Sequence, residues 1–336
     1  METMKVLFIG GTGVISSACA ALAVERGIDL YLLNRGQSAR PVPAGAHRLT
    51  GDIRDRESAR QALGTLTFDV VVNWIAYTPE HIEADLALFR GRTGQYIFIS
   101  SASAYQTPPA SLPVTESTPL DNPVWAYSQA KIACEERLWR AYREEKFPVT
   151  IVRPSHTYDC TKLPFYGGYT VLHRMREGKK VIVHGDGTSL WVLTHHRDFA
   201  KGFVGLLGNS RAIGDAVHIT SDELLTWNQI FQAVASAAGV EARLVHIPSD
   251  FIAHFNPEWG VNLLGDKSHS MIFDNTKIKR LVPGFAASIP FSVGAREIVA
   301  WYMADPARQV VDPVLDRQMD EIIAAYESAW PGQTAD

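Results

Sequence analysis

The feature that most constrains the fold is a glycine-rich turn between a strand pattern and a helix pattern. The apolar run Val6–Ile9 leads directly into Gly10–Gly13 (GGTG), and a helical pattern over residues 13–26 follows at once. Glycine suits such a turn because the backbone takes positive φ there, and a Cβ would hold the backbone away from a pyrophosphate at the helix N-terminus. The turn therefore predicts dinucleotide binding, with a turn that needs only tight geometry as the alternative.

Short, continuous apolar runs alternate with helix-length segments through the first half of the chain. Such runs are typical of strands buried on both faces of a parallel sheet. We expect strands at 6–9, 30–33, 70–72, 96–99 and 149–152. We expect helices between them at 13–26, 55–63, 79–92 and 125–146. The last of these helices carries Glu135, Glu136 and Arg137, which we expect on a solvated side. The pattern predicts a doubly wound α/β fold with a parallel sheet.

The regular alternation ends at Arg153-Pro154. We interpret residues 1–154 as the dinucleotide-binding domain and residues 155–336 as mainly a smaller substrate-binding lobe over the carboxyl edge of the sheet, where open α/β sheets bind ligands. Segments at about 190–220 are expected to return to the first domain. In the second half we expect helices at 169–177, 197–208, 226–238, 290–304 and 316–328, and strands near 181–183 and 243–247.

Charge and hydropathy exclude several classes of function. Lys and Arg number 32 against 36 Asp and Glu, which gives a net charge of −4 and no broad positive surface for nucleic acid or an anionic membrane. The apolar runs are far shorter than the ~18 residues of a membrane-spanning helix, and no signal peptide is visible, so we expect a cytoplasmic protein. Three cysteines without a Cys-x-x-Cys pair predict neither a disulfide framework nor a metal site.

The second expected strand ends in Asn34-Arg35, about where a protein that prefers NAD carries an acidic residue for the ribose 2′-OH. A carboxylate would repel a 2′-phosphate, whereas Arg35 can pair with one and Asn34 can hydrogen-bond either form. The pair therefore favours NADP. The alternative is that Arg35 only begins a polar turn.

Tyr127 and Lys131 lie four residues apart near the start of the expected helix at 125–146, which places the phenol and the ammonium on one helix face. A tyrosine with its ordinary pKa of about 10 is too weak a base at neutral pH, and a neighbouring cation lowers that value. We therefore expect Lys131, together with an oxidised nicotinamide, to lower the pKa of Tyr127. Ser101, just after an expected strand, lies at the end of the sheet where its hydroxyl can bind the same substrate oxygen.

These motifs together resemble the extended short-chain dehydrogenase/reductase family, the NAD-dependent epimerase/dehydratase group. The resemblance rests on the glycine turn, on Ser100–Tyr105 after a strand, on Tyr127-x-x-x-Lys131, on Arg153-Pro154, and on Gly185-Asp186-Gly187 with Asp198 beyond it. The region of Trp191 resembles the branch of chloroplast stem-loop-binding proteins. The family implies a Rossmann-type sheet with a smaller C-terminal lobe, a bound NAD(P)(H), and a homodimer through the helices at 79–92 and 125–146.

The resemblance also implies site residues, each at a position that matches a family motif. The catalytic residues that it implies are Ser101, Tyr127 and Lys131. The cofactor contacts that it implies are Gly10, Thr12, Gly13, Val14, Ile15, Asn34, Arg35, Asp52, Ile53, Ile75, Ala76, Lys131, Pro154 and His156.

The sequence departs from the family pattern at several positions. Ala102 and Ser103 stand where 4,6-dehydratases have Asp and Glu, so we do not expect dehydration. Trp191 stands where many members that act on nucleotide sugars have an arginine, which we interpret as a bias away from a strongly anionic substrate. Ser16 replaces the third glycine of the turn, and His156 stands where asparagine is common.

Substrate contacts are expected from aromatic and polar side chains near the ends of strands, since a ring face with hydroxyl or imidazole groups suits a polyhydroxylated molecule. These candidates are Trp74, Tyr77, Ser103, Tyr105, Trp191 and His195. The alternative is that the aromatic residues pack in the core and that His195-His196 form a turn before a helix.

The sequence thus predicts an NAD(P)-dependent oxidoreductase or epimerase that acts on a hydroxyl or ketone of a sugar-like small molecule. An alternative is a cofactor-binding protein with little turnover, either regulatory or RNA-associated. For RNA, the basic segment His173–Lys180 could contact phosphates, although the overall negative charge argues against nucleic-acid binding as the main function.

Overall fold

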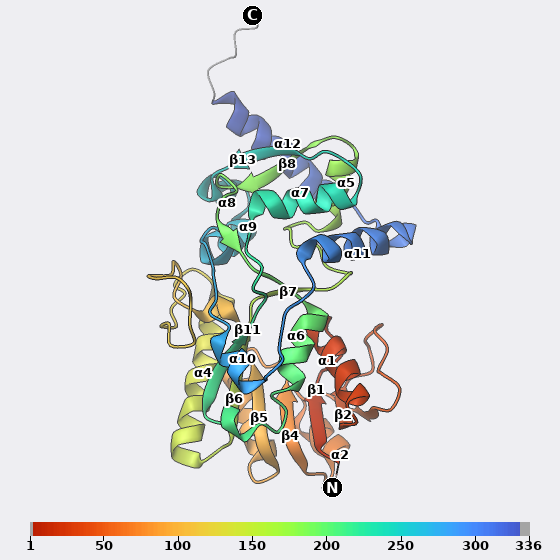
Figure 1. Cartoon of the computed structure of the whole chain (residues 1–336), viewed down its shortest axis with the longest axis vertical. Helices are drawn as coiled ribbons and strands as arrows, with labels where there is room; N and C mark the ends of the chain where they lie inside the picture. The colour runs from red at the N-terminus through yellow and green to blue at the C-terminus, as the bar shows by residue number, and fades with distance from the viewer. Residues whose placement is uncertain (1–2, 330–336) are drawn as a thin grey trace, which may run out of the picture.

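Six strands from the first half of the chain and one from the second form a parallel sheet of seven strands, as the computed structural model of residues 3–329 shows (Figure 1). The strand order is β11-β6-β5-β4-β1-β2-β3, and every neighbouring pair is parallel. The strands are β1 (Lys5–Ile9), β2 (Asp29–Asn34), β3 (His47–Thr50), β4 (Phe68–Asn73), β5 (Thr93–Ile99), β6 (Val149–Pro154) and β11 (Asp215–Ile219). The sheet is Rossmann-like, as the sequence predicts.

Helices cover both faces of this sheet because its central strands carry apolar side chains on both sides. On one face lie α1 (Val14–Glu25), α6 (His196–Val204) and α10 (Thr276–Leu281). On the other lie α2 (Arg56–Leu63), α3 (Pro79–Phe89) and α4 (Ala126–Glu145). The strand β11 and helices α6 and α10 come from the second half of the chain, so the two halves share one core.

The rest of the second half builds a smaller lobe above the sheet (Figure 1). Its strands form three short pairs: β7 (His156–Tyr158) with β10 (Leu193–His195), β8 (Lys180–His184) with β13 (Arg243–Ile247), and β9 (Leu190–Trp191) with β12 (Leu225–Thr226). Its helices are α5 (Tyr169–Arg176), α7 (Trp227–Ala237), α8 (Ser249–Phe255), α9 (Pro257–Asn262), α11 (Phe291–Met303) and α12 (Pro313–Ser328). Short helical turns are η1 (Ala102–Ala104), η2 (Ser210–Ala212), the π-helical η3 (Leu263–Lys267) and η4 (Pro306–Arg308).

The expected helices and strands are present with bounds shifted by a few residues, but several elements have no sequence prediction. The strand β3 was not expected because it lies at one edge of the sheet and its residues His47–Thr50 are largely exposed, so it has no apolar run. The helices α8, α9 and α10 have six or seven residues each, too few to show a helical period.

The expectation that Glu135 lies on a solvated side of its helix is wrong. Glu135 is fully buried and forms a bidentate ion pair with Arg153 of β6, with Arg153 Nε 3.0 Å and Nη2 2.5 Å from the carboxylate oxygens. The Arg153 guanidinium also lies 4.8 Å from the ring centroid of Tyr105. Burial alone would lower the pKa of Arg153, but the hydrogen bonds and charge of Glu135 raise it above its usual value. The pair joins α4 to β6 beneath the ends of the strands.

A buried carboxyl on α3 gives a prediction about stability. Asp85 accepts hydrogen bonds from Asn73 and Tyr96, and burial raises its pKa to about 6. The folded state therefore keeps this proton between about pH 4 and 6, where the unfolded chain releases it, so this carboxyl lowers the free energy of unfolding as pH rises through that window. Relative to the wild type, Asp85→Asn should gain up to about 3 kcal/mol between pH 4 and 7 in urea unfolding. A difference between the two proteins that stays constant with pH would contradict this assignment.

Candidate active site

Two cavities open at the carboxyl end of the sheet, and more than half of the predicted site residues line one or the other. Of the predicted catalytic and cofactor residues, those that line neither are Gly13, Val14, Ile15, Ala76, Tyr127 and Lys131. The larger, the glycine-turn cavity, has a volume of about 580 Å³. It is lined by the predicted residues Gly10, Thr12, Asn34, Arg35, Asp52, Ile53, Ile75 and Tyr77. The smaller, the Ser101 cavity, has a volume of about 170 Å³. It is lined by the predicted residues Ser101, Ser103, Pro154, His156 and Trp191.

The glycine turn has the properties of an anion site. Gly10 and Gly11 have φ of +100° and +97°, and a Cβ on Gly11 would lie 2.7 Å from Leu32 Cδ2. The helix α1, which begins with Val14 and Ile15, has no acidic residue in its first turn, so its positive end is not neutralised by a neighbouring carboxylate. The Gly13 amide donates to the Ser16 hydroxyl at 2.8 Å, so serine at this position braces the turn. A phosphate group fits these surroundings.

The far end of the glycine-turn cavity carries unengaged polar groups. Asn34 Oδ1 accepts a hydrogen bond from the Gly36 amide at 3.0 Å, which leaves the Asn34 Nδ2 donors available. Arg35 is exposed, and within residues 3–329 its guanidinium has no hydrogen bond or ion pair. Arg54, which the sequence did not single out, also lines the cavity and donates to the Ile75 carbonyl. The donor set and the shape of the turn therefore fit a dinucleotide.

Tyr127, Lys131 and Ser101 meet between the two cavities. Tyr127 lies in the first turn of α4, and Lys131 Nζ is 5.8 Å from the centroid of its ring. Lys131 is 2% exposed, and its Nζ donates to the carbonyls of Ala76 at 2.7 Å and Ile99 at 2.8 Å, beyond β4 and at the end of β5. Ser101 is close enough to Tyr127 to lower the pKa of its phenol. The three side chains thus form one polar group at the end of the central strands.

Lys131 also connects this group to the glycine-turn cavity. Its Nζ lies 4.8 Å from the ring centroid of Tyr77, which is 45% exposed and lines that cavity. Ser101 in turn lines the Ser101 cavity. The group formed by Ser101, Tyr127 and Lys131 is therefore in contact with the lining of both cavities.

The pKa values of Tyr127 and Lys131 depart from their ordinary values. Burial raises the pKa of Tyr127 to about 12, although the hydrogen bond from Ser101 acts in the opposite direction. Burial also lowers the pKa of Lys131 to about 8. Lys131 by itself does not lower the pKa of Tyr127, because two carbonyl oxygens hold the ammonium and burial of the phenol dominates. A phenolate here needs a further positive charge.

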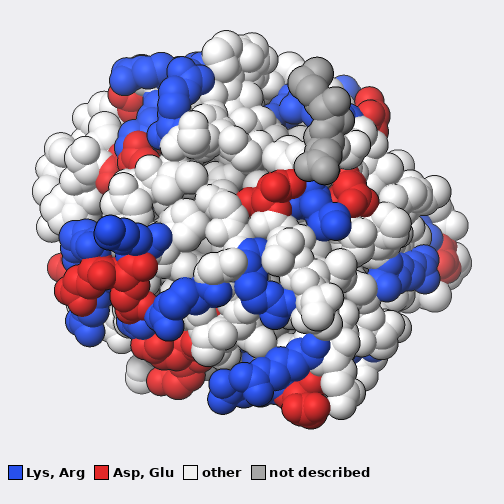
Figure 2. Space-filling view, turned by 90° about the horizontal axis from the view of Figure 1, so that it is seen from below, with Lys and Arg blue, Asp and Glu red and all other residues white. Residues whose placement is uncertain are grey.

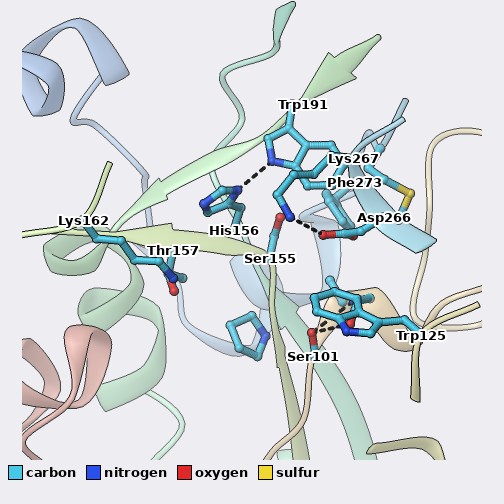
Figure 3. Close-up of a pocket in the computed structure, with 14 residues that line it drawn as sticks. Ser101, Trp125, Ser155, His156, Thr157, Lys162, Trp191, Asp266, Lys267 and Phe273 are labelled. Atoms are coloured by element: carbon cyan, nitrogen blue, oxygen red, sulfur yellow. Dashed lines mark hydrogen bonds and ion pairs between the residues drawn. The ribbon is translucent and has the colours of Figure 1, made fainter. Parts of the chain in front are cut away.

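The Ser101 cavity combines aromatic and basic side chains (Figure 3). Trp191, which is buried, donates from its indole nitrogen to His156 Nδ1 at 3.0 Å. Burial lowers the pKa of His156 well below its usual range, so the ring is neutral and its Nε2 carries the proton. Residues that the sequence did not predict also line this cavity: Trp125, Thr157, Lys162, Asp266, Lys267, Met271 and Phe273.

Three predicted substrate residues lie outside both cavities. Trp74 packs against aromatic rings of β1 and α6 in the core. Tyr105 is fully buried, and its hydroxyl lies 3.0 Å from His218 Nδ1. His195 caps α6 through Nδ1, and its Nε2 lies 2.9 Å from a carboxylate oxygen of Glu297. Trp74 and Tyr105 thus pack in the core, and His195 forms the turn before a helix, as the alternative interpretation states. We no longer assign these three residues to substrate binding.

Comparison with known proteins identifies the family. The sequence profile of the NAD dependent epimerase/dehydratase family matches residues 6–219. The chain belongs to this family. One relative, the chloroplast stem-loop binding protein of 41 kDa b from Arabidopsis thaliana, is 27% identical over 273 residues, which cover 76% of this chain and 66% of the relative. Another, 2'-dehydrokanamycin reductase from Streptomyces kanamyceticus, is 24% identical over 289 residues, 84% of this chain and 80% of the relative.

Solved structures of the family share the fold. UDP-glucose 4-epimerase from Bifidobacterium longum, determined in complex with NAD+ and UDP, superposes with a TM-score of 0.72 at 18% identity and covers 91% of this chain and 100% of that one. Within residues 3–329, no helix combines the length and apolar character that a membrane span requires, and no three His, Cys, Asp or Glu side chains are grouped to hold a metal ion.

Proposed function

We propose that this protein is an NAD(P)-dependent oxidoreductase or epimerase that acts on a hydroxyl or ketone of a sugar-like small molecule. The observation that carries the proposal is the place of Tyr127. It lies beside Ser101, which lines the Ser101 cavity, and beside Lys131, whose ammonium faces Tyr77 of the glycine-turn cavity. A cofactor in the first cavity and a substrate in the second would both reach the phenol.

In this proposal each residue has one task. An oxidised nicotinamide, if bound, would supply a hydride acceptor for the carbinol carbon and the positive charge that the buried phenol needs. Tyr127 as phenolate takes the hydroxyl proton, and Ser101 holds the substrate oxygen by a hydrogen bond. Lys131 fixes the ends of β4 and β5 against α4 and carries a positive charge below about pH 8. Return of the hydride to the opposite face of the ketone would give epimerisation.

The direct test is turnover by the wild-type chain. We expect oxidation of NAD(P)H or reduction of NAD(P)+ in the presence of members of a panel of hydroxy and keto sugars, followed by absorbance at the nicotinamide band and by chromatography of the sugars for epimer formation. A chain that binds dinucleotide but converts no member of a broad panel would favour the regulatory alternative. A chain that binds no dinucleotide would contradict the proposal outright.

The unengaged guanidinium of Arg35 supports a preference for NADP within this proposal. It is exposed beside Asn34, and no carboxylate stands there to repel a 2′-phosphate. A charge-assisted hydrogen bond contributes roughly 1.5–3 kcal/mol, so Arg35→Gln should raise the Kd for NADP+ by about 10- to 100-fold. The Kd for NAD+ in the same variant is the internal control and should change little. If the Kd values for NADP+ and NAD+ rose equally, Arg35 would stabilise the loop and would not bind the 2′-phosphate.

We also propose that the reaction is not a 4,6-dehydration. Ala102 and Ser103 of η1 carry no carboxyl group, and the Ser103 hydroxyl is engaged by Ser101 at 2.9 Å and by Ser128 at 2.8 Å. The acid that lines the Ser101 cavity, Asp266, is paired with Lys267. No side chain of η1 therefore supplies the acid and base that elimination of water requires.

RNA binding through His173–Lys180 gains no support from the structure. Arg174 is buried and bonded to Asp316 and Asp320, while Lys179 pairs with Asp316 and Lys180 with Glu327. Helix α12 thus neutralises most of the basic segment. Figure 2 shows the opposite end of the molecule, seen from below, where basic and acidic side chains are interspersed and form no single broad positive patch. The homodimer through α3 and α4 and the cytoplasmic location stay predictions.

A further inference from the structure

The Ser101 cavity has more positive than negative charge. From Trp191, the sequence predicts a bias away from a strongly anionic substrate. Its ionised lining residues are Lys162, Lys267 and Asp266, and His156 is neutral. Lys162 is exposed, and within the described residues 3–329 its ammonium has no hydrogen bond or ion pair. One positive charge therefore remains after Lys267 pairs with Asp266. The absence of arginine at position 191 does not leave this cavity without cations.

The ammonium of Lys267 is mostly buried, but it does not use all of its hydrogen-bond donors. The side chain is 13% exposed, and Nζ lies 5.8 Å from the ring centroid of Trp125 and 6.0 Å from that of Trp191. Among the residues described, its single acceptor is Asp266 Oδ2 at 3.3 Å, a long contact for an ammonium that has three donors. Two donors are therefore left for a ligand in a place where little water reaches them.

Hydrogen bonds fix the segment that carries Lys267 against the loop that follows Ser101. Asn122, which is buried, donates to the carbonyls of Gly265 at 2.7 Å and Ser103 at 2.9 Å. The carbonyl of Lys267 lies 3.0 Å from His184 Nε2. A Cβ on Gly265 would lie 3.0 Å from Trp125 Cβ, so the close approach needs glycine. Lys267 also ends the π-helical η3, and single π-helical turns occur frequently at functional sites.

We propose that Lys267, assisted by Lys162, binds an oxyanion on the substrate, so that the substrate is a small acidic sugar-like molecule with a carboxylate or a phosphate. This inference rests on the proposed function, because it places the reacting hydroxyl at Ser101 and Tyr127 and the anionic group at Lys267 (Figure 3). The cavity volume of about 170 Å³ is below the ~300–1,000 Å³ of sites for drug-sized ligands, which favours a monosaccharide over a nucleotide sugar.

The test measures binding apart from turnover, in the Tyr127→Phe chain loaded with NADP+. The probes are D-glucose, D-glucuronate and D-glucose 6-phosphate, and the readout is tryptophan fluorescence, since Trp125 and Trp191 flank Lys267. We expect at least one acidic probe to bind about 10- to 100-fold more tightly than glucose, as charge-assisted hydrogen bonds predict. The tighter of the two acidic probes distinguishes carboxylate from phosphate as the natural group.

Variants assign the effect to Lys267. Lys267→Met should remove the preference for the acidic probe, Lys267→Arg should retain most of it, and Lys162→Met should weaken it. Lys279→Met, which removes an exposed lysine paired with Asp222, is the matched control and should leave it unchanged. Equal binding of the three probes, a preference that survives Lys267→Met, or no saturable binding of either acidic probe overturns the inference. If the wild-type chain converts only neutral sugars, the inference about Lys267 is wrong and the proposed function stands. If the chain binds the acidic probe but converts no sugar, the inference stands and the proposed function is wrong.

Discussion

Replacing Tyr127 by phenylalanine is expected to lower kcat by about 10²- to 10⁴-fold, the usual contribution of a positioned acid or base. The side chain lies in the first turn of α4, next to Ser101. Its ring centroid is 5.8 Å from Lys131 Nζ. Phenylalanine keeps the ring and its packing but removes the proton acceptor. The Kd for the dinucleotide should therefore stay within a few-fold of the wild-type value, because the glycine-turn cavity is unchanged.

The control for this variant is Tyr142→Phe, on the same helix. Tyr142 is exposed near the end of α4 and lines neither the glycine-turn cavity nor the Ser101 cavity, so its loss of a hydroxyl should leave kcat unchanged. Steady-state kinetics with a substrate found in the panel, together with dinucleotide titration, make the comparison. If Tyr127→Phe retained activity close to that of Tyr142→Phe, the catalytic assignment would be wrong and a binding role would replace it.

The second large effect concerns stability: Glu135→Gln should lower the free energy of unfolding by about 3–5 kcal/mol. Both members of the Glu135–Arg153 pair are almost completely buried, and the carboxylate makes two hydrogen bonds to the guanidinium. The amide keeps the size of the side chain but leaves the Arg153 cation without its counter-charge in the interior. Urea unfolding followed by circular dichroism measures the loss.

A double variant separates charge from packing. Glu135→Leu combined with Arg153→Met removes both charges, and replacement of a buried ion pair by apolar residues of similar size is frequently neutral or stabilising. We therefore expect the double variant to recover most of the stability that Glu135→Gln loses. A double variant as unstable as the single one would show that the hydrogen bond from Arg153 to the Glu116 carbonyl, or its contact with Tyr105, matters more than the charge pairing.

The parts of the site that the sequence predicted are those encoded over short distances along the chain. The glycine turn, Tyr127 with Lys131, and Ser101 after its strand each occupy a few consecutive residues, and local geometry is enough to place them. The α/β architecture followed for the same reason, since each central strand is a continuous apolar run. The edge strand β3 lacks such a run and was missed.

The parts that the sequence could not predict depend on contacts between distant residues. Glu135 sits in a Glu-Glu-Arg run that is typical of an exposed helix face, and only the return of β6 places Arg153 beside it. His195 resembles a substrate ligand until Glu297 is seen to engage its ring. Lys267 belongs to no motif, and it enters the Ser101 cavity because Asn122 and His184 hold its backbone there.

The pairing of β11 with β6 determines how the chain can be divided. A fragment that stopped at residue 154 would lose β11, and β6 would then present a row of unpaired backbone groups at the border of the sheet. Its residues Val149–Val152 are fully buried in the intact chain, so the exposed strand would be mostly apolar. Such strands are templates for edge-to-edge aggregation. We therefore expect the dinucleotide-binding half to aggregate when it is expressed without the second half. Truncated or chimeric proteins should keep the two halves together.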